Sequence, residues 1–380
     1  MAPNDKAACA LEYLDALLAA EDGPVLIALR TELAKVLSDK WKVWPEFTRL
    51  LAIVMLRNWN WARTESLSTL LIDTVCRTDS MTTLSWVLSK MPIFSFAQAF
   101  RIYRLTVARL PQLQGDQHSR EDIVRITAAN ASYAELEGCE SLEAEGRSEV
   151  LALWEQIDCL PDSYKLEFAQ ASLWQVEQSL HGIGSPSKEH AAILIRRLQW
   201  ASRVFGKVPA PDRRDPWESL LNVFSAVVCV GWEDDAIKIL SDAFFDLLIL
   251  ALENGSYGTF YHLQEEVPVW LGIKEGHMRG GHGQRKALSP FRFIDDQLLK
   301  FSSLLVTRVG MWKRQGVSIN DFAYSRILSG LETAKVLETL ASLANDRDGY
   351  LDNLRAIVDE FIDCGFSEAG IALRTRLFHV

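Results

Sequence analysis

Helical periodicity runs through almost the whole chain and limits the fold more than any other feature of the sequence. In the first segment, Leu11, Leu14, Leu17 and Leu18 follow the i, i+3, i+4 spacing of an amphipathic helix, and Asn4 is placed to cap it. The same spacing recurs downstream between short connections, with no convincing run of alternating apolar and polar residues. We therefore predict an all-α protein with about 16–18 helices.

Capping residues, prolines and glycines predict where the helices begin and end. Ser80 and Ser119 stand at expected N-caps, and Pro111 and Gly138 stand where helices should end. VFSAVVCVGW at 223–232 is the one β-like stretch, and a buried helix explains it equally well. The helices expected in the second half cover 147–158, 162–181, 188–205, 215–230, 232–253, 256–270, 289–314, 319–329, 331–344, 348–363 and 366–378.

Helix starts recur about every 20 residues, which is typical of stacked helical hairpins. GWEDDAIKIL at 231–240 and GFSEAGIALR at 365–374 share a glycine, an aromatic residue and a later isoleucine, and lie 134 residues apart. That distance is four units of about 33.5, close to the tetratricopeptide period of about 34 residues. Because intermediate copies cannot be traced, we predict an irregular α-solenoid or stacked helical hairpins with TPR- or HEAT-like spacing, and name no repeat family.

Two connections divide the predicted helices. HGIGSPSKEH at 181–190 combines glycine, proline and serine, and predicts an N-terminal helical lobe over residues 1–181 and a C-terminal lobe over residues 188–380. GKVPAPDRRDP at 206–216 contains three prolines and is an alternative joint. One continuous solenoid is equally consistent with the pattern.

Composition is that of an ordinary globular protein. Of the 380 residues, 48% are hydrophobic and 24% are charged. The six cysteines form no CxxC pair and no Cys/His cluster with zinc spacing. The N-terminal segment lacks the basic start of a signal peptide, and the longest apolar run is short and interrupted by Asp246. We therefore predict a cytoplasmic protein without a membrane segment.

Charge is unevenly distributed along a chain whose net charge is −10. Between Glu135 and Glu149, six glutamates stand against Arg147 alone, a net charge of −5. Between Lys274 and Arg314, nine basic residues stand against three acidic ones, a net charge of +6. Regions of opposite sign can steer and select a charged partner, although most charge runs are solvated faces.

The least helical stretch is GHMRGGHGQRKAL at 276–288, which contains four glycines. It lacks the GxxxxGK[ST] pattern and follows a predicted helix rather than a strand, which argues against a phosphate-binding loop. His277 and His282 lie five residues apart without a surrounding ligand set, so no metal site is predicted. A flexible basic connector is the favoured interpretation, and a loop that becomes ordered on a partner is the alternative.

Two groups of residues are the candidate partner contacts. In the glycine-rich region, the basic side chains that would bind an acidic protein or nucleic acid are Arg279, Arg285, Lys286 and Arg292. Near the N-terminus, the rigid aromatic anchors that would line a partner groove are Trp41, Trp44, Trp59 and Trp61. The alternative for the tryptophans is that they pack the first helical hairpins together.

No local signature of an enzyme is present, because HExxH, GxSxG and Walker motifs are all missing. The carboxylates at 233–235, 265–266 and 295–296 are adjacent in sequence, so on a helix they point in different directions. We therefore predict no catalytic residue, cofactor or metal.

The function predicted from these features is a non-enzymatic scaffold, adaptor or regulator that binds, and can sequester, a partner protein. The first alternative is a helical protein that binds nucleic acid through its basic region at 274–314, which the net charge disfavours. The second alternative is an enzyme whose site is assembled from distant residues.

Overall fold

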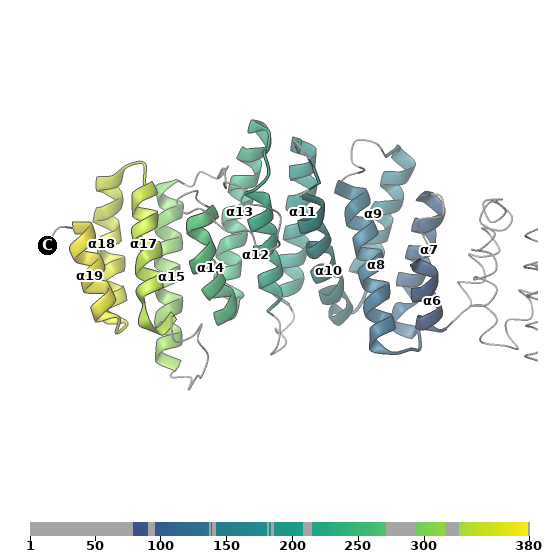
Figure 1. The fold of residues 1–380 in the computed structure, drawn as a ribbon, viewed down its shortest axis with the longest axis horizontal. Coiled ribbons are helices and arrows are strands. Elements are labelled where there is room, and N and C mark those ends of the chain that lie inside the picture. Colours follow the sequence, from purple (N-terminus) through teal and green to yellow (C-terminus); the bar gives the residue numbers. More distant parts are fainter. Residues whose placement is uncertain are drawn as a thin grey trace, which may run out of the picture. The chain divides into compact units, whose positions relative to one another are not determined.

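A computed structural model describes residues 79–89, 96–136, 138, 142–180, 182–183, 186–207, 215–270, 294–315 and 327–378. Within these ranges it contains thirteen α-helices, one short 3-10 helix and no strand (Figure 1). The all-α prediction is confirmed. The helices predicted before residue 79 lie outside the described residues.

The observed helices agree closely with the predicted ranges. Residues 188–205 are predicted and observed as one helix, for which Ser187 is the N-cap. The Ser187 backbone N–H donates to Nδ1 of His190 at 3.2 Å, and this bond fixes the first turn. The β-like stretch at 223–232 is helical through Val227, where the helix Pro216–Val227 ends, and continues as turns, so no strand forms there.

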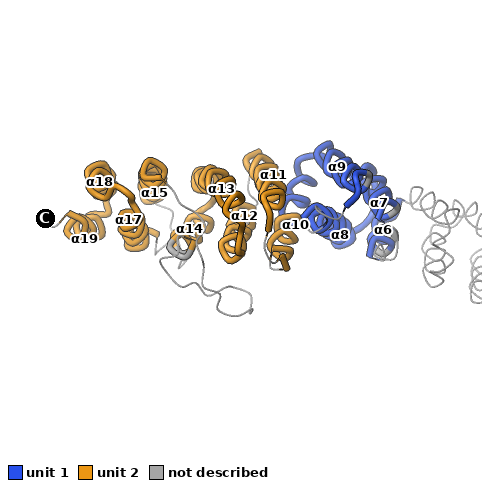
Figure 2. The backbone as a smooth tube through the Cα atoms, turned by 90° about the horizontal axis from the view of Figure 1, so that it is seen from above, with its two compact units in different colours: residues 1–171 blue, residues 172–380 orange. Residues whose placement is uncertain are grey.

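The chain forms two compact units, residues 1–171 and residues 172–380, and the boundary falls within one helix (Figure 2). The lobes inferred from the connections at 181–190 and 206–216 stay a prediction. The helices of unit 1 are α6 (Met81–Leu88), α7 (Phe96–Arg109), a 3-10 turn (Leu110–Gln112), α8 (Gln117–Leu136), α9 (Ala144–Asp158) and the first part of α10 (Asp162–Leu180).

In unit 1, α6 packs against α8 and α7 packs against α9, so the packed partners are helices two apart in sequence. The backbone N–H of Met81 donates to the Gln114 carbonyl, and the N–H of Gln114 donates to the Asp79 carbonyl, both at 2.8 Å. These bonds join the two segments immediately before α6 and α8. The two helices therefore start at the same end of the unit and run parallel.

Unit 2 repeats this arrangement in two rows, which Figure 2 shows from above. Row A contains α11 (Lys188–Phe205), α13 (Asp234–Asn254), α15 (Asp295–Gln315) and α18 (Arg347–Asp363). Row B contains α12 (Pro216–Val227), α14 (Tyr257–Trp270), α17 (Leu331–Leu343) and α19 (Ser367–Phe378). Within each row, every helix packs against the next member of that row.

An aromatic cluster fills the space between the rows. Phe224 of α12, Phe244 of α13 and Trp270 of α14 are all buried. The Phe224 and Phe244 ring centroids are 4.0 Å apart, and each lies 5.9 Å from the Trp270 ring at close to a right angle. Burial of each such side chain stabilises the fold by about 2–3 kcal/mol. The Trp270 indole N–H donates to Ser225 Oγ at 3.0 Å, which satisfies its polar atom.

The two similar sequence segments at 231–240 and 365–374 share a local structure. Trp232 and Phe366 are both buried directly before a helix start, that of α13 and that of α19. Their helices pack differently, however, because α13 lies against α11 whereas α19 lies against α17 and α18. The resemblance between the segments is therefore a shared way of starting a helix.

Candidate functional site

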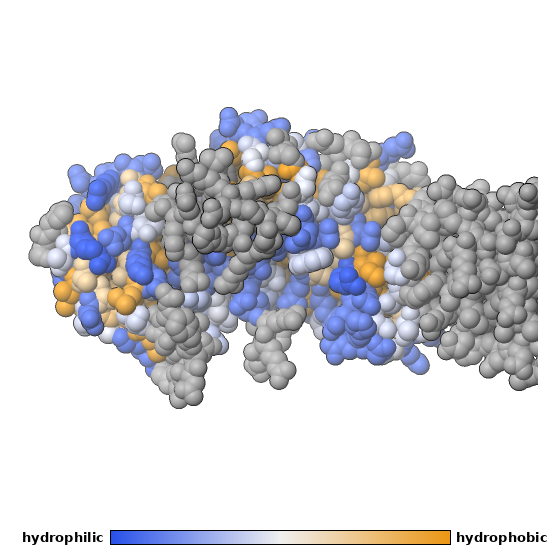
Figure 3. Space-filling model, in the orientation of Figure 1, coloured by the Kyte–Doolittle hydropathy of each residue, from blue (hydrophilic) through white to orange (hydrophobic). Residues whose placement is uncertain are grey.

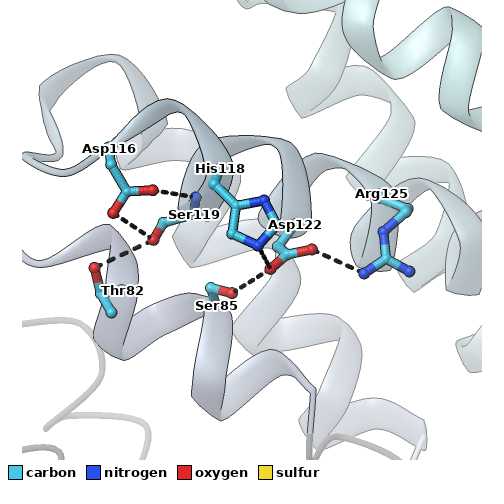
Figure 4. A network of polar contacts seen from close by, with 7 residues as sticks. All are labelled: Thr82, Ser85, Asp116, His118, Ser119, Asp122 and Arg125. Carbon is cyan, nitrogen blue, oxygen red and sulfur yellow. Dashed lines mark hydrogen bonds and ion pairs between the residues drawn. The ribbon is translucent and has the colours of Figure 1, made fainter.

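A network of polar side chains joins α6 to the start of α8 in unit 1 (Figure 4). The carboxylate of Asp116 accepts the Ser119 backbone N–H at 2.7 Å and the Ser119 hydroxyl at 3.0 Å. These two bonds hold the pKa of Asp116 below its usual value. The prediction that Ser119 caps this helix was wrong: α8 starts at Gln117, and Asp116 takes the capping role because an ionised carboxylate is the stronger acceptor.

Two hydroxyl contacts extend this network to α6. Thr82 Oγ1 lies 3.2 Å from Ser119 Oγ, and Ser85 Oγ donates to Asp122 at 3.5 Å. Asp122 also forms an ion pair with Arg125 of the same helix, in which Nη2 of Arg125 lies 2.8 Å from Oδ1 of Asp122. The network therefore connects two neighbouring helices at their N-terminal halves.

The network contains serine, histidine and aspartate, the residue types of a nucleophilic triad, but in a different order. A triad places the histidine between the other two, so that it can take the proton of the serine. Here Asp122 lies between Ser85 and His118, whose Nε2 is 3.7 Å from the Asp122 carboxylate. The His118 side chain is 85% exposed. The Ser85 hydroxyl thus donates to Asp122 and not to the histidine, an arrangement that joins α6 to α8.

Asp215 makes an equivalent junction in unit 2. It precedes α12, and its carboxylate accepts the Trp217 backbone N–H at 3.0 Å. The same carboxylate accepts the Ser256 backbone N–H at 2.6 Å and the Thr259 hydroxyl, both at the start of α14. One side chain therefore serves the N-terminal groups of two row B neighbours.

Asp295, the first residue of α15, links that helix to the start of α18 in row A. Its carboxylate accepts the backbone N–H groups of Asn345 and Asp346, each at 2.8 Å, just before α18 begins. These bonds hold the pKa of Asp295 below its usual value. Farther along the same pair of helices, Ser302 Oγ lies 3.2 Å from the buried hydroxyl of Tyr350, and burial raises the pKa of Tyr350 to about 12.

The three aspartates share one physical cause. Neighbours within a row run parallel, so their N-termini lie side by side, and each terminus carries unpaired N–H groups and a partial positive charge. A carboxylate at such a terminus stabilises it: Asp215 accepts from both of its helix starts, Asp295 from the start of α18, and Asp116 from the start of α8. Asp116, Asp215 and Asp295 are called the junction aspartates below. No sequence motif identifies them as junctions, and the available signal was an aspartate directly before or at a predicted helix start.

Two basic side chains donate hydrogen bonds to backbone carbonyls at helix C-termini. Arg308 donates to the carbonyl of Gly255, the C-cap of α13, at 2.9 Å, and its guanidinium lies 4.8 Å from the Trp312 ring centroid. Burial lowers the pKa of Arg308. Lys313 donates to the carbonyl of Gly365, directly after α18. Both residues belong to the basic region at 274–314, and both bind within their own chain.

The acidic region at 135–149 is also only partly free for a partner. Glu135 is buried in α8. Glu149 pairs with Arg104 of α7 at 2.9 Å, which ties α9 to α7. Glu143 is exposed at the N-cap position of α9. Charge that looks continuous in the sequence is thus divided among core, helix pairing and surface.

The residues predicted as partner contacts lie outside the described residues and stay predictions. They are Arg279, Arg285, Lys286, Arg292, Trp41, Trp44, Trp59 and Trp61. Within the described ranges, no three His, Cys, Asp or Glu side chains gather as a metal-ligand group. Among the helices of those ranges, none has the length and apolar character needed to cross a membrane.

Large apolar side chains are exposed on several helices, including Leu250 of α13, Leu331 of α17 and Ile371 of α19. On the face drawn in Figure 3, hydrophobic residues are interspersed with hydrophilic ones. Single exposed apolar residues are normal on protein surfaces, so they define no site by themselves.

Comparison with known proteins assigns no family to the chain. No protein-family model matches it, and no curated protein matches it.

Proposed function

We propose that the chain is a non-enzymatic helical scaffold that binds a partner protein through the outward surface of row A. The observation that carries this proposal is the accessibility of row A. Each of α11, α13, α15 and α18 has exposed residues distributed along its length, whereas in row B α12 is exposed only at Glu218 and Asn222 and the described side chains of α14 only at Tyr257. The last helix of row B, α19, is exposed along its length as well. Stacked helices that leave one long face accessible are the usual architecture of helical binding scaffolds.

The use of the polar side chains supports the same proposal. The junction aspartates, Arg308 and Lys313 all satisfy helix termini inside the chain. The most elaborate polar networks are thus explained by the joining of helices. An irregular α-solenoid is the finer fold that we propose, because packing between helices two apart is what stacked helical hairpins produce.

Charge gives the row A surface its selectivity. The α18 helix exposes four carboxylates, Asp348, Asp352, Glu360 and Asp363, beside Arg347 and Arg355. The α11 helix exposes Lys188, Arg196 and Arg203 beside Glu189. Surface charges of this kind raise association rates and exclude wrong partners more than they add affinity. A cytoplasmic location belongs to the proposal, and it is supported by the described cysteines, Cys159, Cys229 and Cys364, none of which forms a disulfide.

The test is capture of the partner from extracts of the source cells at low and at raised salt, with and without nuclease. The proposal expects a stoichiometric protein partner that survives nuclease treatment and binds again when both proteins are purified. Recovery of nucleic acid alone would favour the nucleic-acid alternative. Turnover of a small molecule by the purified chain would favour the enzyme alternative.

A further inference from the structure

Unit 2 is a stack of helix pairs, and one place in the stack is built differently from its neighbours. At this place, called the central step, α13 packs against α15 in row A and α14 packs against α17 in row B (Figure 2). The preceding step is joined by Asp215 and the following step by Asp295. None of the three junction aspartates lies at the central step, so its polar contacts come from other side chains.

In row B, the central step buries an amide that is only partly paired. Gln264 of α14 is 3% exposed, and Thr333 of α17 is completely buried. The Gln264 Nε2 group donates to Thr333 Oγ1, but Gln264 Oε1 accepts no hydrogen bond from any described residue. A buried acceptor without a partner raises the free energy of the packed state, because it has given up its hydrogen bonds to water.

In row A, the same step contains an arginine with one unpaired group. Arg308 of α15 donates through Nη2 to the Gly255 carbonyl after α13, whereas its buried Nε–H has no acceptor among the described residues. The guanidinium lies over Trp312, whose ring meets that of Phe260 of α14 at close to a right angle, with 4.6 Å between the centroids. Row A and row B thus each bury one unpaired polar group at this step.

The neighbouring steps pair their buried polar atoms. The Trp270 indole N–H donates to a serine of α12 at the preceding step, and the buried hydroxyls of Ser302 and Tyr350 bind each other at the following step. Within the described part of unit 2, Gln264 Oε1 and Arg308 Nε are the only buried side-chain atoms without a hydrogen-bond partner. The stability of a helical stack is approximately a sum over interfaces between neighbours, so the step that carries both of these penalties separates first.

We propose that the central step is a hinge, at which the pair α13 and α14 rotates against the pair α15 and α17. Opening of this step lets water reach Gln264 Oε1 and Arg308 Nε, and the hydrogen bonds that they regain offset part of the apolar contact that is lost. Two helices of row A lie on each side of the hinge, α11 and α13 on one side and α15 and α18 on the other. Bending at the hinge therefore changes the curvature of the row A surface.

The test measures distances across the central step in the purified full-length chain by pulsed electron paramagnetic resonance. Nitroxide labels are attached to p-acetylphenylalanine, which leaves the native cysteines unlabelled. One label pair, at Gln199 of α11 and Ala356 of α18, spans the central step, whereas the pairs Gln199 with Asn222 and Ser342 with Ala356 each lie on one side of it. All of these positions are exposed. We expect a broad distance distribution for the spanning pair and narrow distributions for the other two.

The decisive variant replaces the partly paired contact by apolar side chains of similar size. Gln264→Leu with Thr333→Val removes the unpaired acceptor, so the population of bent conformers should fall by about tenfold and the spanning distribution should narrow. The matched control, Ser302→Ala with Tyr350→Phe, removes a paired contact at the following step and should not narrow this distribution. A second variant, Arg308→Lys, removes the unpaired Nε–H, retains the positive charge, and should narrow the distribution as well.

Circular dichroism shows which variants are folded, and the Arg308 variant provides the test if the double variant is not. A spanning distribution as narrow as those of the other two pairs overturns the proposal. So does a broad spanning distribution that neither folded variant narrows, or one that the control narrows equally. The hinge is a property of the purified chain, so this test is independent of whether the chain binds a partner protein.

Discussion

The junction aspartate Asp215 offers the sharpest test of how the rows are held together. Its carboxylate caps α12 through the Trp217 backbone N–H and also binds the Ser256 N–H and the Thr259 hydroxyl at the start of α14. The change Asp215→Ala removes all three acceptor contacts together. No other described side chain is seen to accept from the Ser256 N–H, so that group loses its protein partner.

The expected cost follows from the individual contacts. Loss of an N-cap costs about 1 kcal/mol, and each hydrogen bond to a charged acceptor contributes about 1.5–3 kcal/mol before relaxation. Water can reach the partly buried site and replaces some of these hydrogen bonds, so we expect the free energy of unfolding to fall by about 2–4 kcal/mol. Because α12 and α14 are adjacent in row B, the effect is concentrated at the end of the rows where these two helices start.

The assay combines urea unfolding with amide hydrogen exchange. A loss of about 2.7 kcal/mol corresponds to roughly 100-fold faster exchange of the Ser256 amide through local opening. The matched control is Glu233→Ala, since Glu233 is also an N-cap residue but its side chain makes no capping hydrogen bond. We expect that control to cost less than about 0.5 kcal/mol. Equal losses for the Asp215 and Glu233 variants would refute the reasoning.

Three further changes test other parts of the structure. Phe224→Ala opens the aromatic cluster and should cost about 3–5 kcal/mol in urea unfolding, whereas Leu250→Ala, at a side chain 38% exposed, should cost less than about 1 kcal/mol. The fold lowers the pKa of Asp295, so the ionised carboxylate stabilises the protein fully above its ordinary pKa of 3.8, and this stabilisation is lost as the pH falls through the pKa of the folded state. The melting temperatures of wild type and Asp295→Asn should therefore converge at low pH. A difference that stays constant with pH would contradict this. Gly330→Ala should lower the free energy of unfolding by about 1–3 kcal/mol, because Gly330 has a φ of 72° and a Cβ there would lie 2.5 Å from a neighbouring ring. Gly231 has open space around it, so Gly231→Ala should be nearly neutral. Equal losses for the two variants in thermal unfolding would contradict this prediction.

Helix existence and most helix boundaries in the described residues could be predicted from the sequence. The signals were local: capping residues, prolines and glycines near helix ends, and apolar residues spaced at three and four. The error at α8 arose because two acceptors, Asp116 and Ser119, compete within one turn. Sequence pattern does not show which of them the backbone N–H groups will meet.

The junctions could not be predicted, because they depend on which helices become neighbours. Asp215 and Ser256 are 41 residues apart, and no local rule pairs them. Arg308 counted toward a basic region in the sequence but binds the Gly255 carbonyl in the fold. Charge summed along a segment mixes residues that face the core, a neighbouring helix and solvent.

The accessible face of row A is the centre of this account, and cross-linking mass spectrometry of the captured complex tests it most directly. Row A and its first connection expose Lys188, Lys207, Lys238 and Lys300, whereas Lys335 is exposed on α17 of row B. The account predicts that cross-links to the partner protein concentrate on the row A lysines and that Lys335 gives few. Cross-links concentrated on Lys335, with the row A lysines unmodified by the partner, would contradict it.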